Sequence, residues 1–549
     1  MIIIKFELNE TDVLGRIGKI EINNKSMITP NLFPVIHPFE NLLTPNQLKE
    51  IGAEAIFTNA FILYQNKDTR ETLLKNGIHK FLDYKGIIAT DSGAFQQYMY
   101  KNEIEIKADE IEFFQEEIGS DFPVILDVPV QMHDSYQTAR TKVIENIKRA
   151  KENILRRHDN DRNWIGPIHG GIYRDLLETS TIEMNKLDFP LHAIGGLVKP
   201  FLDYRFNITL EMLLTVKKKI LCNRPLHMFG LGLPQFFSLA VACGCDLMDS
   251  AAYILYAKEN RYFTLSSGTK KLDEIYEFPC NCPICTKYTP MEIKKFEDAF
   301  RIELIAKHNL YISFSELKTI RQAIKDGNLL ELVETRIRNH PNLVNAYRLV
   351  RDESKLFELY DRSYNIHGRL FSSIESSFRP IFYRYRKKLE SYYQNPSNNR
   401  FLILLPELDA RGENSPTTKH WIDSINNSSY LENEAFDLCF ISPFFGIIPF
   451  EFSEIYPLGQ HERLDMRHFT EIGFEIIKKF IKINVKKYEL VGILLPKKYI
   501  NQFNEEIDFS TSSPIYHIKE YLTKEYRHKI ITDSDIKSLL EHFKNVMER

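Results

Sequence analysis

The chain has 549 residues, of which 43% are hydrophobic and 26% are charged, and its net charge at neutral pH is −3. This composition indicates a globular protein of roughly two to four domains and excludes a disordered chain, while the small net charge indicates no particular partner. No apolar run reaches the roughly 18 residues of a membrane span, so we expect no membrane partner. The segment Met1–Lys5 lacks the features of a signal peptide, so we expect a cytoplasmic protein.

The first half of the chain alternates short apolar runs with amphipathic stretches. Residues 1–30 alternate apolar and polar positions around Gly15 and Gly18, which predicts a hairpin. The predicted strands that follow are Ala55–Thr58, Ile87–Thr90, Val124–Leu126, Trp164–Ile168, His192–Ile194, Leu226–Phe229 and Asp246–Met248. Helical patterns separate them, for example at 137–157 and 210–220. This alternation predicts a parallel α/β sheet, and the number of repeats favours a closed, TIM-like (β/α)8 barrel over an open sheet.

Acidic residues and glycines stand where these predicted strands end. Asp91, Asp127 and Asp249 each follow one of the runs directly. Glycines follow three other runs, as Gly170-Gly171, Gly195-Gly196 and Gly230-Leu231-Gly232. A single aspartate after a strand is usually a turn or cap residue, but three beside three glycine-rich turns are harder to explain that way. Because the carboxyl ends of barrel strands form one mouth, we expect these residues to line a common pocket.

Three of the seven cysteines, Cys280, Cys282 and Cys285, lie within six positions of one another. This spacing favours a metal site over disulfides. The pair Thr289-Pro290 predicts the N-cap and first turn of a helix. Side chains that share one face of that helix at every fourth position are Phe296, Phe300, Leu304 and His308.

Three thiolates and the His308 ring form a closed tetrahedral set for structural Zn²⁺. The corresponding zinc subdomain is expected at about residues 270–315. Because a closed site has no open position for water, we expect the metal to stabilise the fold without taking part in the chemistry.

The second half of the chain predicts three further segments. Residues 346–398 are expected to form a helical connector, which carries a basic cluster whose simplest interpretation is a solvated helix face. That cluster is Arg384, Arg386, Lys387 and Lys388. A small α/β domain is expected at 399–505 and a helical tail at 506–549. The predicted elements of the small domain are strands at Phe401–Leu405, Leu438–Ile441 and Leu490–Leu495, and a helix at Phe469–Ile483.

Two carboxylates at one barrel mouth fit a displacement at an anomeric carbon, in which one attacks C1′ and the other moves protons to and from the leaving group. A third carboxylate, Asp127, together with the backbone of Gly196 and Leu197, fits recognition of the edge of a planar base. Phe95 fits stacking on the face of that base. These residues alone leave hydrolysis of a sugar bond and aldol chemistry open.

Several motifs in these segments resemble those of the tRNA-guanine transglycosylases. They are DSGAFQ at 91–96, AIGGLVKP at 193–200, HMFGLGLP at 227–234, GCDLMDSAAY at 244–253, FPCNCPIC at 278–285 and AKHNLY at 306–311. Their context is closer to the archaeal branch than to the bacterial queuine-type enzymes. A segment at 440–462 is similar to the C-terminal region of the archaeal enzymes. The resemblance covers residues 1–345, which we expect to form the catalytic domain.

The resemblance implies that guanine at position 15 of the tRNA D-arm is exchanged for 7-cyano-7-deazaguanine (preQ0), the precursor of archaeosine. It implies that Asp249 is the nucleophile that forms a covalent link to ribose C1′ and that Asp91 is the general acid and base. The implied substrate-binding residues are Asp127, His169, Gly196, Leu197, Val198, Phe95 and Ser92, and the implied zinc ligands are Cys280, Cys282, Cys285 and His308. The implied partners are tRNA, guanine and 7-cyano-7-deazaguanine.

Two features depart from the family pattern. His169 stands where the family usually has a glutamine that contacts the base. The chain also shows no recognisable RNA-binding PUA domain, which leaves open a homodimer and a separate RNA-binding partner protein. It also makes the basic cluster at Arg384, Arg386, Lys387 and Lys388 the first candidate for contact with tRNA, beside its interpretation as a solvated helix face.

Two alternative functions follow from these departures. One is a paralogue of the archaeosine synthase type, but such relatives lack the catalytic acid and the metal ligands that this chain retains. The other is a non-catalytic, tRNA-binding paralogue or subunit, which would form no covalent adduct with tRNA.

Overall fold

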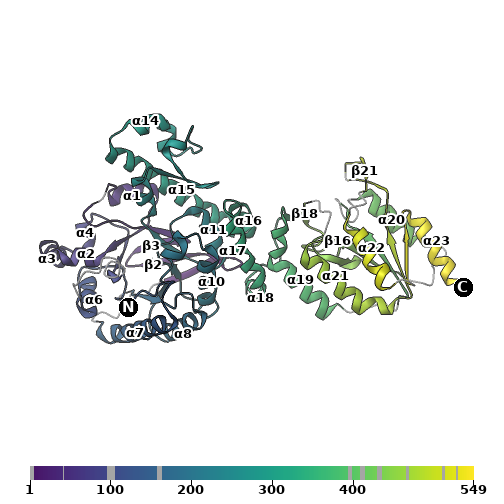
Figure 1. Ribbon diagram of the computed structural model, residues 1–549, viewed down its shortest axis with the longest axis horizontal. Helices are drawn as coiled ribbons and strands as arrows, with labels where there is room; N and C mark the ends of the chain where they lie inside the picture. The colour runs from purple at the N-terminus through teal and green to yellow at the C-terminus, as the bar shows by residue number, and fades with distance from the viewer. Residues whose placement is uncertain are drawn as a thin grey trace. The chain divides into compact units, whose positions relative to one another are not determined.

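The computed structural model describes residues 5–40, 42–94, 106–157, 163–393, 399–408, 415–428, 436–464, 469–501, 503–509, 513–526 and 529–548. Its contacts divide the chain into two compact units, Met1–Tyr360 and Asp361–Arg549 (Figure 1). The predicted connector at 346–398 therefore spans the division between the units instead of forming a separate part. Among the described residues, no helix is both long enough and apolar enough to cross a membrane.

An antiparallel sheet of three strands opens the first unit. Its strands are β1 (Lys5–Asp12), β2 (Gly15–Ile22) and β3 (Lys25–Thr29), paired in the order β1-β2-β3. The predicted hairpin is therefore present, with a third strand added. A Cβ atom at Gly18 in β2 would lie 2.9 Å from the carbonyl oxygen of Glu7 and 2.4 Å from the ring of Phe6, so any larger residue would make its neighbours shift.

Eight short parallel strands follow in the described part of this unit. They are β4 (Asn31–Pro34), β5 (Ala55–Asn59), β6 (Ile87–Asp91), β7 (Phe122–Pro123), β8 (Ile165–Ile168), β9 (Leu191–Ile194), β10 (Leu226–Met228) and β11 (Leu247–Ser250). They form two sheets, in the orders β4-β11-β10-β9-β8 and β5-β6-β7. Single parallel bridges join the sheets, from Val35 to Phe57 and from Val124 to Ile165. The strand pairings therefore form a closed cycle that runs from β4 through β11 and back to β4.

An apolar core lies between the strands, and helices surround them. Phe33, Phe57 and Phe122 belong to one buried cluster, and the pairs of rings around Phe33 meet edge to face. The surrounding helices that matter for the site are α6 (Ala108–Glu117), α7 (Tyr136–Arg156), α8 (Arg174–Asn185), α10 (Phe206–Lys217), α11 (Pro234–Ala242) and α15 (Asp298–Asp326) (Figure 1). The helices predicted at 137–157 and 210–220 are thus α7 and α10, with ends shifted by a few residues.

One predicted strand, Val124–Leu126, is wrong in its position. The strand β7 ends at Pro123, and Val124 makes only an isolated bridge. Beyond β7, the carbonyl of Ile125 accepts a hydrogen bond from the Ser92 hydroxyl at 3.1 Å. This side-chain bond takes the place of a strand ladder.

The second unit contains a five-stranded sheet in the order β17-β16-β15-β19-β22. Its strands are β15 (Phe401–Pro406), β16 (Phe436–Ser442), β17 (Gly446–Pro449), β19 (Leu490–Leu494) and β22 (Ile530–Asp533). The three predicted strands and the predicted helix, here α21 (Glu471–Asn484), are present. The expected helical tail at 506–549 is wrong, because β22 lies in that segment and pairs with β19 in parallel. The helices α22 (Pro514–Glu525) and α23 (Ile536–Met547) flank this strand.

Candidate active site and metal centre

Asp249 lies near the carboxyl end of β11, and two groups hold its carboxylate. The backbone N–H of Gly230 donates to Oδ1 at 3.2 Å. The Nε2 atom of His227, from the neighbouring strand β10, lies 2.8 Å from the same oxygen. Since a carboxylate only accepts hydrogen bonds, the ring must carry its proton on Nε2. Both donors fall on Oδ1, so Oδ2 is the oxygen that remains for a substrate.

The surroundings of His227 are aromatic and dry. Its ring centroid lies 5.5 Å from that of Phe33, 6.1 Å from that of Phe57 and 5.2 Å from that of Phe229. The side chain is fully buried, and Nδ1 has no hydrogen-bond partner among the described residues. Sequence reasoning did not identify His227, although a polar residue in the middle of an otherwise apolar strand is the signal that marks it.

Asp91 ends β6, and its carboxyl group has an unusual proton affinity. The side-chain amide of Asn59 donates to Oδ2 at 3.0 Å. Burial, and after it the negative charges of Asp127 and Asp249, raise the pKa of Asp91 to about 7. The three predicted aspartates are therefore close enough for their charges to interact. A carboxyl group with this pKa both gives and takes a proton near neutral pH.

Asp127 is paired with His169. The Nε2 atom of His169 lies 2.5 Å from Oδ2 of Asp127, and the ring is only 1% exposed. A Cβ atom at Gly195 would lie 2.1 Å from Cε1 of this ring, so only glycine leaves room for it. His169 therefore lies behind Asp127 as its hydrogen-bond partner, and a direct contact between the ring and a base stays a prediction.

The other predicted substrate-binding residues follow strands β6 and β9. Ser92 is buried, and its hydroxyl bonds to the main chain. Gly196 has a φ of +80°, and a Cβ atom there would lie 2.4 Å from the carbonyl oxygen of Val130, so glycine is required. Leu197 is buried, and Val198 begins the short helix α9 (Val198–Leu202). Phe95 lies outside the described residues.

The four predicted metal ligands come together in the structure. The sulfur and nitrogen atoms of Cys280, Cys282, Cys285 and His308 all lie within 4.8 Å of one another. His308 Nδ1 is 3.3 Å from Cys285 Sγ and 3.5 Å from Cys282 Sγ, and these two sulfurs are 3.5 Å apart. A tetrahedral zinc site separates its ligand atoms by about 3.5–3.8 Å. The donor set and its spacing therefore fit Zn²⁺.

A second layer of contacts fixes the His308 ring. Its Nε2 atom bonds to the carbonyl oxygen of Phe263 at 2.9 Å, so Nε2 carries the proton and Nδ1 is free to bind a metal. The ring of Tyr262 stacks on the imidazole with centroids 3.5 Å apart. The hydroxyl of Tyr262 also lies 3.2 Å from Cys285 Sγ. This packing holds both ligands in place.

The single helix predicted from Thr289 is instead two helices. Thr289 caps α14 (Pro290–Lys295) with a complete capping box, as expected. The chain leaves the helix at Phe296, and α15 begins at Asp298. Phe300 is 40% exposed, so the shared buried face includes Leu304 and His308 only.

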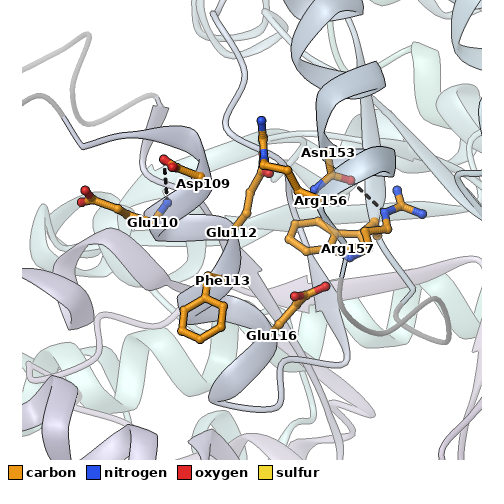
Figure 2. A pocket seen from close by; sticks show the side chains of 9 residues that line it. Asp109, Glu110, Glu112, Phe113, Glu116, Asn153, Arg156 and Arg157 are labelled. Atoms are coloured by element: carbon orange, nitrogen blue, oxygen red, sulfur yellow. Dashed lines mark hydrogen bonds and ion pairs between the residues drawn. The ribbon is translucent and has the colours of Figure 1, made fainter.

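A cavity of about 540 Å³ opens elsewhere in the first unit, along α6 and α7 (Figure 2). An ion pair between the buried Glu112 and the half-buried Arg156, at 2.6 Å, joins the two helices there. Burial lowers the pKa of the neighbouring Arg157 to about 10. None of the predicted site residues that the structure describes lines this cavity, so the carboxylate site and this cavity are distinct.

Comparison with known proteins identifies the class to which this fold and this site belong. A model of the family described as queuine tRNA-ribosyltransferase matches residues 12–342. The chain belongs to this family, and it is an enzyme of the tRNA-modifying transferase type. The expected membership in the tRNA-guanine transglycosylases is thereby confirmed.

Curated relatives place the chain with the archaeal branch. It is 36% identical to the tRNA-guanine(15) transglycosylase of Methanocaldococcus jannaschii, over 96% of this chain and 79% of that protein. It is also 36% identical to the protein of the same name from Methanococcus vannielii, over 97% of this chain and 80% of that protein. For the protein of that name from Methanothermobacter thermautotrophicus, the identity is 34% over 92% and 76% of the two chains.

Proposed function

We propose that this protein exchanges guanine at position 15 of tRNA for 7-cyano-7-deazaguanine, which places it in archaeosine biosynthesis. The relatives' name, tRNA-guanine(15) transglycosylase, supports the position and the leaving base. We infer that the cyclic order of eight parallel strands is a TIM-like (β/α)8 barrel, whose carboxyl-end mouth holds the three aspartates. The observation that carries the proposal is the Asp249 carboxylate, held through Oδ1 with Oδ2 left for attack.

In the first half of the proposed reaction, Oδ2 of Asp249 attacks C1′ of the ribose. The bond between C1′ and guanine N9 breaks, and Asp91 delivers its proton to the departing base. The product is a covalent aspartyl-ribose ester and free guanine. The raised pKa of Asp91 supports this role, because the carboxyl group still holds a proton near neutral pH.

In the second half, the incoming base attacks C1′ and displaces Asp249. Asp91, now ionised, takes the proton that the base loses, so both carboxyl groups return to their starting states. Because the same two groups serve both halves, guanine itself is also an acceptable incoming base. Exchange of guanine for guanine therefore provides an assay that needs no other base.

Asp127 is the proposed reader of the base edge. Guanine and 7-cyano-7-deazaguanine share a ring N–H and an amino group, and a carboxylate accepts from both. His169 bonds to Oδ2 of Asp127 and thereby leaves Oδ1 for the base. The backbone of Gly196 and Leu197 is proposed to contact the same edge. Ser92, Val198 and Phe95 complete the proposed set.

Cys280, Cys282, Cys285 and His308 are the proposed ligands of one Zn²⁺ ion. A closed set of four protein ligands supplies folding free energy, and no step of the reaction involves it. The proposed macromolecular partner is tRNA.

The proposal is tested by incorporation of radiolabelled guanine into a tRNA transcript. The wild-type protein is expected to incorporate label, and Asp249→Asn is expected to incorporate none. Wild-type protein that binds tRNA without incorporating guanine would instead support the non-catalytic, tRNA-binding alternative.

A further inference from the structure

The second unit contains a cavity of about 560 Å³, which the site described above does not use. It lies between helix α19 (Pro380–Tyr392) and the segment 451–458 that follows β17. Its volume falls within the ~300–1,000 Å³ typical of small-ligand sites. The cavity is therefore large enough to hold one nucleotide unit.

Aromatic rings form much of its wall. Tyr385, Tyr393, Phe452 and Tyr456 all line it, and Tyr393 meets Phe452 edge to face with centroids 5.5 Å apart. The protein fixes two of these rings through their hydroxyl groups, because Arg369 donates to Tyr456 at 2.7 Å and Tyr385 donates to the carbonyl of Ile447. Rings held in this way present ready faces on which a planar base stacks.

A carboxylate stands beside these rings. The hydroxyl of Tyr393 donates to Oε1 of Glu451 at 2.9 Å, and Glu451 is otherwise exposed to solvent. Its second oxygen has no hydrogen-bond partner among the described residues. It is therefore available to accept a hydrogen bond from the amino group of a base.

One cation on the wall is also available. Arg384 is occupied, since it donates to the carbonyls of Asp361 and Arg362 at 2.8 Å and pairs with the Asp361 carboxylate. Arg386 lies 4.0 Å from Glu390. Lys388 lines the cavity and is exposed, and its ammonium group makes no hydrogen bond or ion pair in the described part of the chain. The basic cluster predicted from the sequence thus offers Lys388 to the cavity.

We propose that this cavity binds one unpaired nucleotide of the tRNA substrate. The base stacks on the aromatic wall, its amino group bonds to Glu451, and the adjoining phosphodiester lies beside Lys388. The exposed ammonium group of Lys388 is available to offset the single charge of a phosphodiester. The proposal rests on the proposed function only in taking tRNA as the substrate.

The test compares tRNA affinity among variants of the full chain by filter binding at fixed salt. Tyr393→Leu removes a ring and is expected to raise the Kd for tRNA roughly 5- to 150-fold, the range of one base stack. Lys388→Ala is expected to raise the Kd and to reduce the slope of log Kd against log salt by about 0.7. The KM for guanine is expected to stay unchanged in both.

Lys387→Ala is the matched control, because Lys387 is exposed on the same helix but does not line the cavity. It is expected to change the Kd less than about twofold. Folding of each variant is checked by its melting temperature, and Lys388→Ala removes only an exposed side chain, so it gives an answer even if Tyr393→Leu does not fold.

Unchanged tRNA affinity in a folded Lys388→Ala protein would overturn the proposal. So would binding of guanosine or adenosine monophosphate that is lost in Tyr393→Leu while tRNA affinity persists, because the cavity would then take free mononucleotides. If both variants lose tRNA affinity but the wild-type protein exchanges no guanine, the proposed function is refuted and the cavity assignment stands.

Discussion

Nε2 of His227 lies 2.8 Å from Oδ1 of Asp249, within a group of phenylalanine rings that exclude water. The hydrogen bond fixes the direction of the carboxylate and leaves one oxygen for attack. Because the ring has no other partner among the described residues, its orientation depends on this bond and on packing. His227 is therefore a positioning residue for the proposed nucleophile.

Replacing His227 with Phe should keep the packing and remove the hydrogen bond. We expect kcat for guanine exchange to fall roughly 10- to 100-fold while the KM for tRNA changes little, because the bond orients a reacting group. Steady-state exchange kinetics measure both quantities. His227→Gln, which restores a donor near the position of Nε2, should recover part of kcat. Equal losses in kcat for both variants, or a loss confined to KM, would contradict the positioning role.

The raised pKa of Asp91 predicts how the first half-reaction depends on pH. Formation of the tRNA adduct needs protonated Asp91, so its single-turnover rate should fall as the pH rises through about 7. Asp91→Asn should be about 10²–10⁴-fold slower and should lose this dependence. Rapid-quench measurements between pH 5.5 and 8.5 give the profile. A wild-type rate that is flat across this range would argue against Asp91 as the proton donor.

The same pKa has a consequence for stability. The folded-state pKa of Asp91 lies above the ordinary value for an aspartate, so the folded protein binds the proton more tightly than the unfolded chain. Stability is therefore lost as the pH rises from the ordinary value towards about 7, and it stays reduced above that pH. Asp91→Asn, which cannot ionise, should melt at a higher temperature than the wild type at pH 8. The difference should shrink at pH 5, and melting curves at the two pH values measure it.

The cysteine cluster predicts a metal that stabilises the protein. Cys282→Ala should lose Zn²⁺ and lower the melting temperature, since binding free energy at a closed site is folding free energy. Elemental analysis and melting curves give both results. Cys222→Ala is the matched control, because Cys222 is an exposed cysteine outside the cluster. Less than about half an equivalent of zinc in freshly purified wild-type protein would contradict the assignment.

The hydrogen bond between His169 and Asp127 predicts that its loss weakens the binding of guanine and leaves the binding of tRNA unchanged. His169→Leu removes the donor to Asp127 and should raise the KM for guanine about tenfold, the effect of one lost charge-assisted hydrogen bond. His169→Gln keeps a donor and should stay closer to the wild type. Exchange kinetics with varied guanine test this, and the Kd for tRNA should not change. A KM for guanine that is unchanged in His169→Leu would leave His169 with a packing role only.

The sequence predicted the parts of the fold that rest on strong local patterns. Apolar runs such as Ile87–Thr90 became strands, and the aspartates that follow three of these runs lie close enough for their charges to interact. The strand β4 was missed because Asn31 and Pro34 occupy two of its four positions and leave no apolar run. β22 was missed for a similar reason, since two isoleucines between helices carry little signal.

Other features depend on contacts that a linear pattern does not contain. The break at Phe296 interrupts an apolar spacing that continues through it, so the sequence favours one helix. The role of His227 depends on Asp249, which lies on a neighbouring strand, and a histidine within a strand is more often a core residue than a functional one. The burial of His169 behind Asp127 likewise depends on the absence of a side chain at Gly195.

The most direct test of the account is whether the enzyme and tRNA form a covalent adduct through Asp249. Wild-type protein mixed with a tRNA transcript should give a slower band on a denaturing gel, and peptide mapping should place the linked ribose on Asp249. Asp249→Asn should bind tRNA and give no such band. An adduct that persists in Asp249→Asn, or one that maps to another residue, would contradict the account.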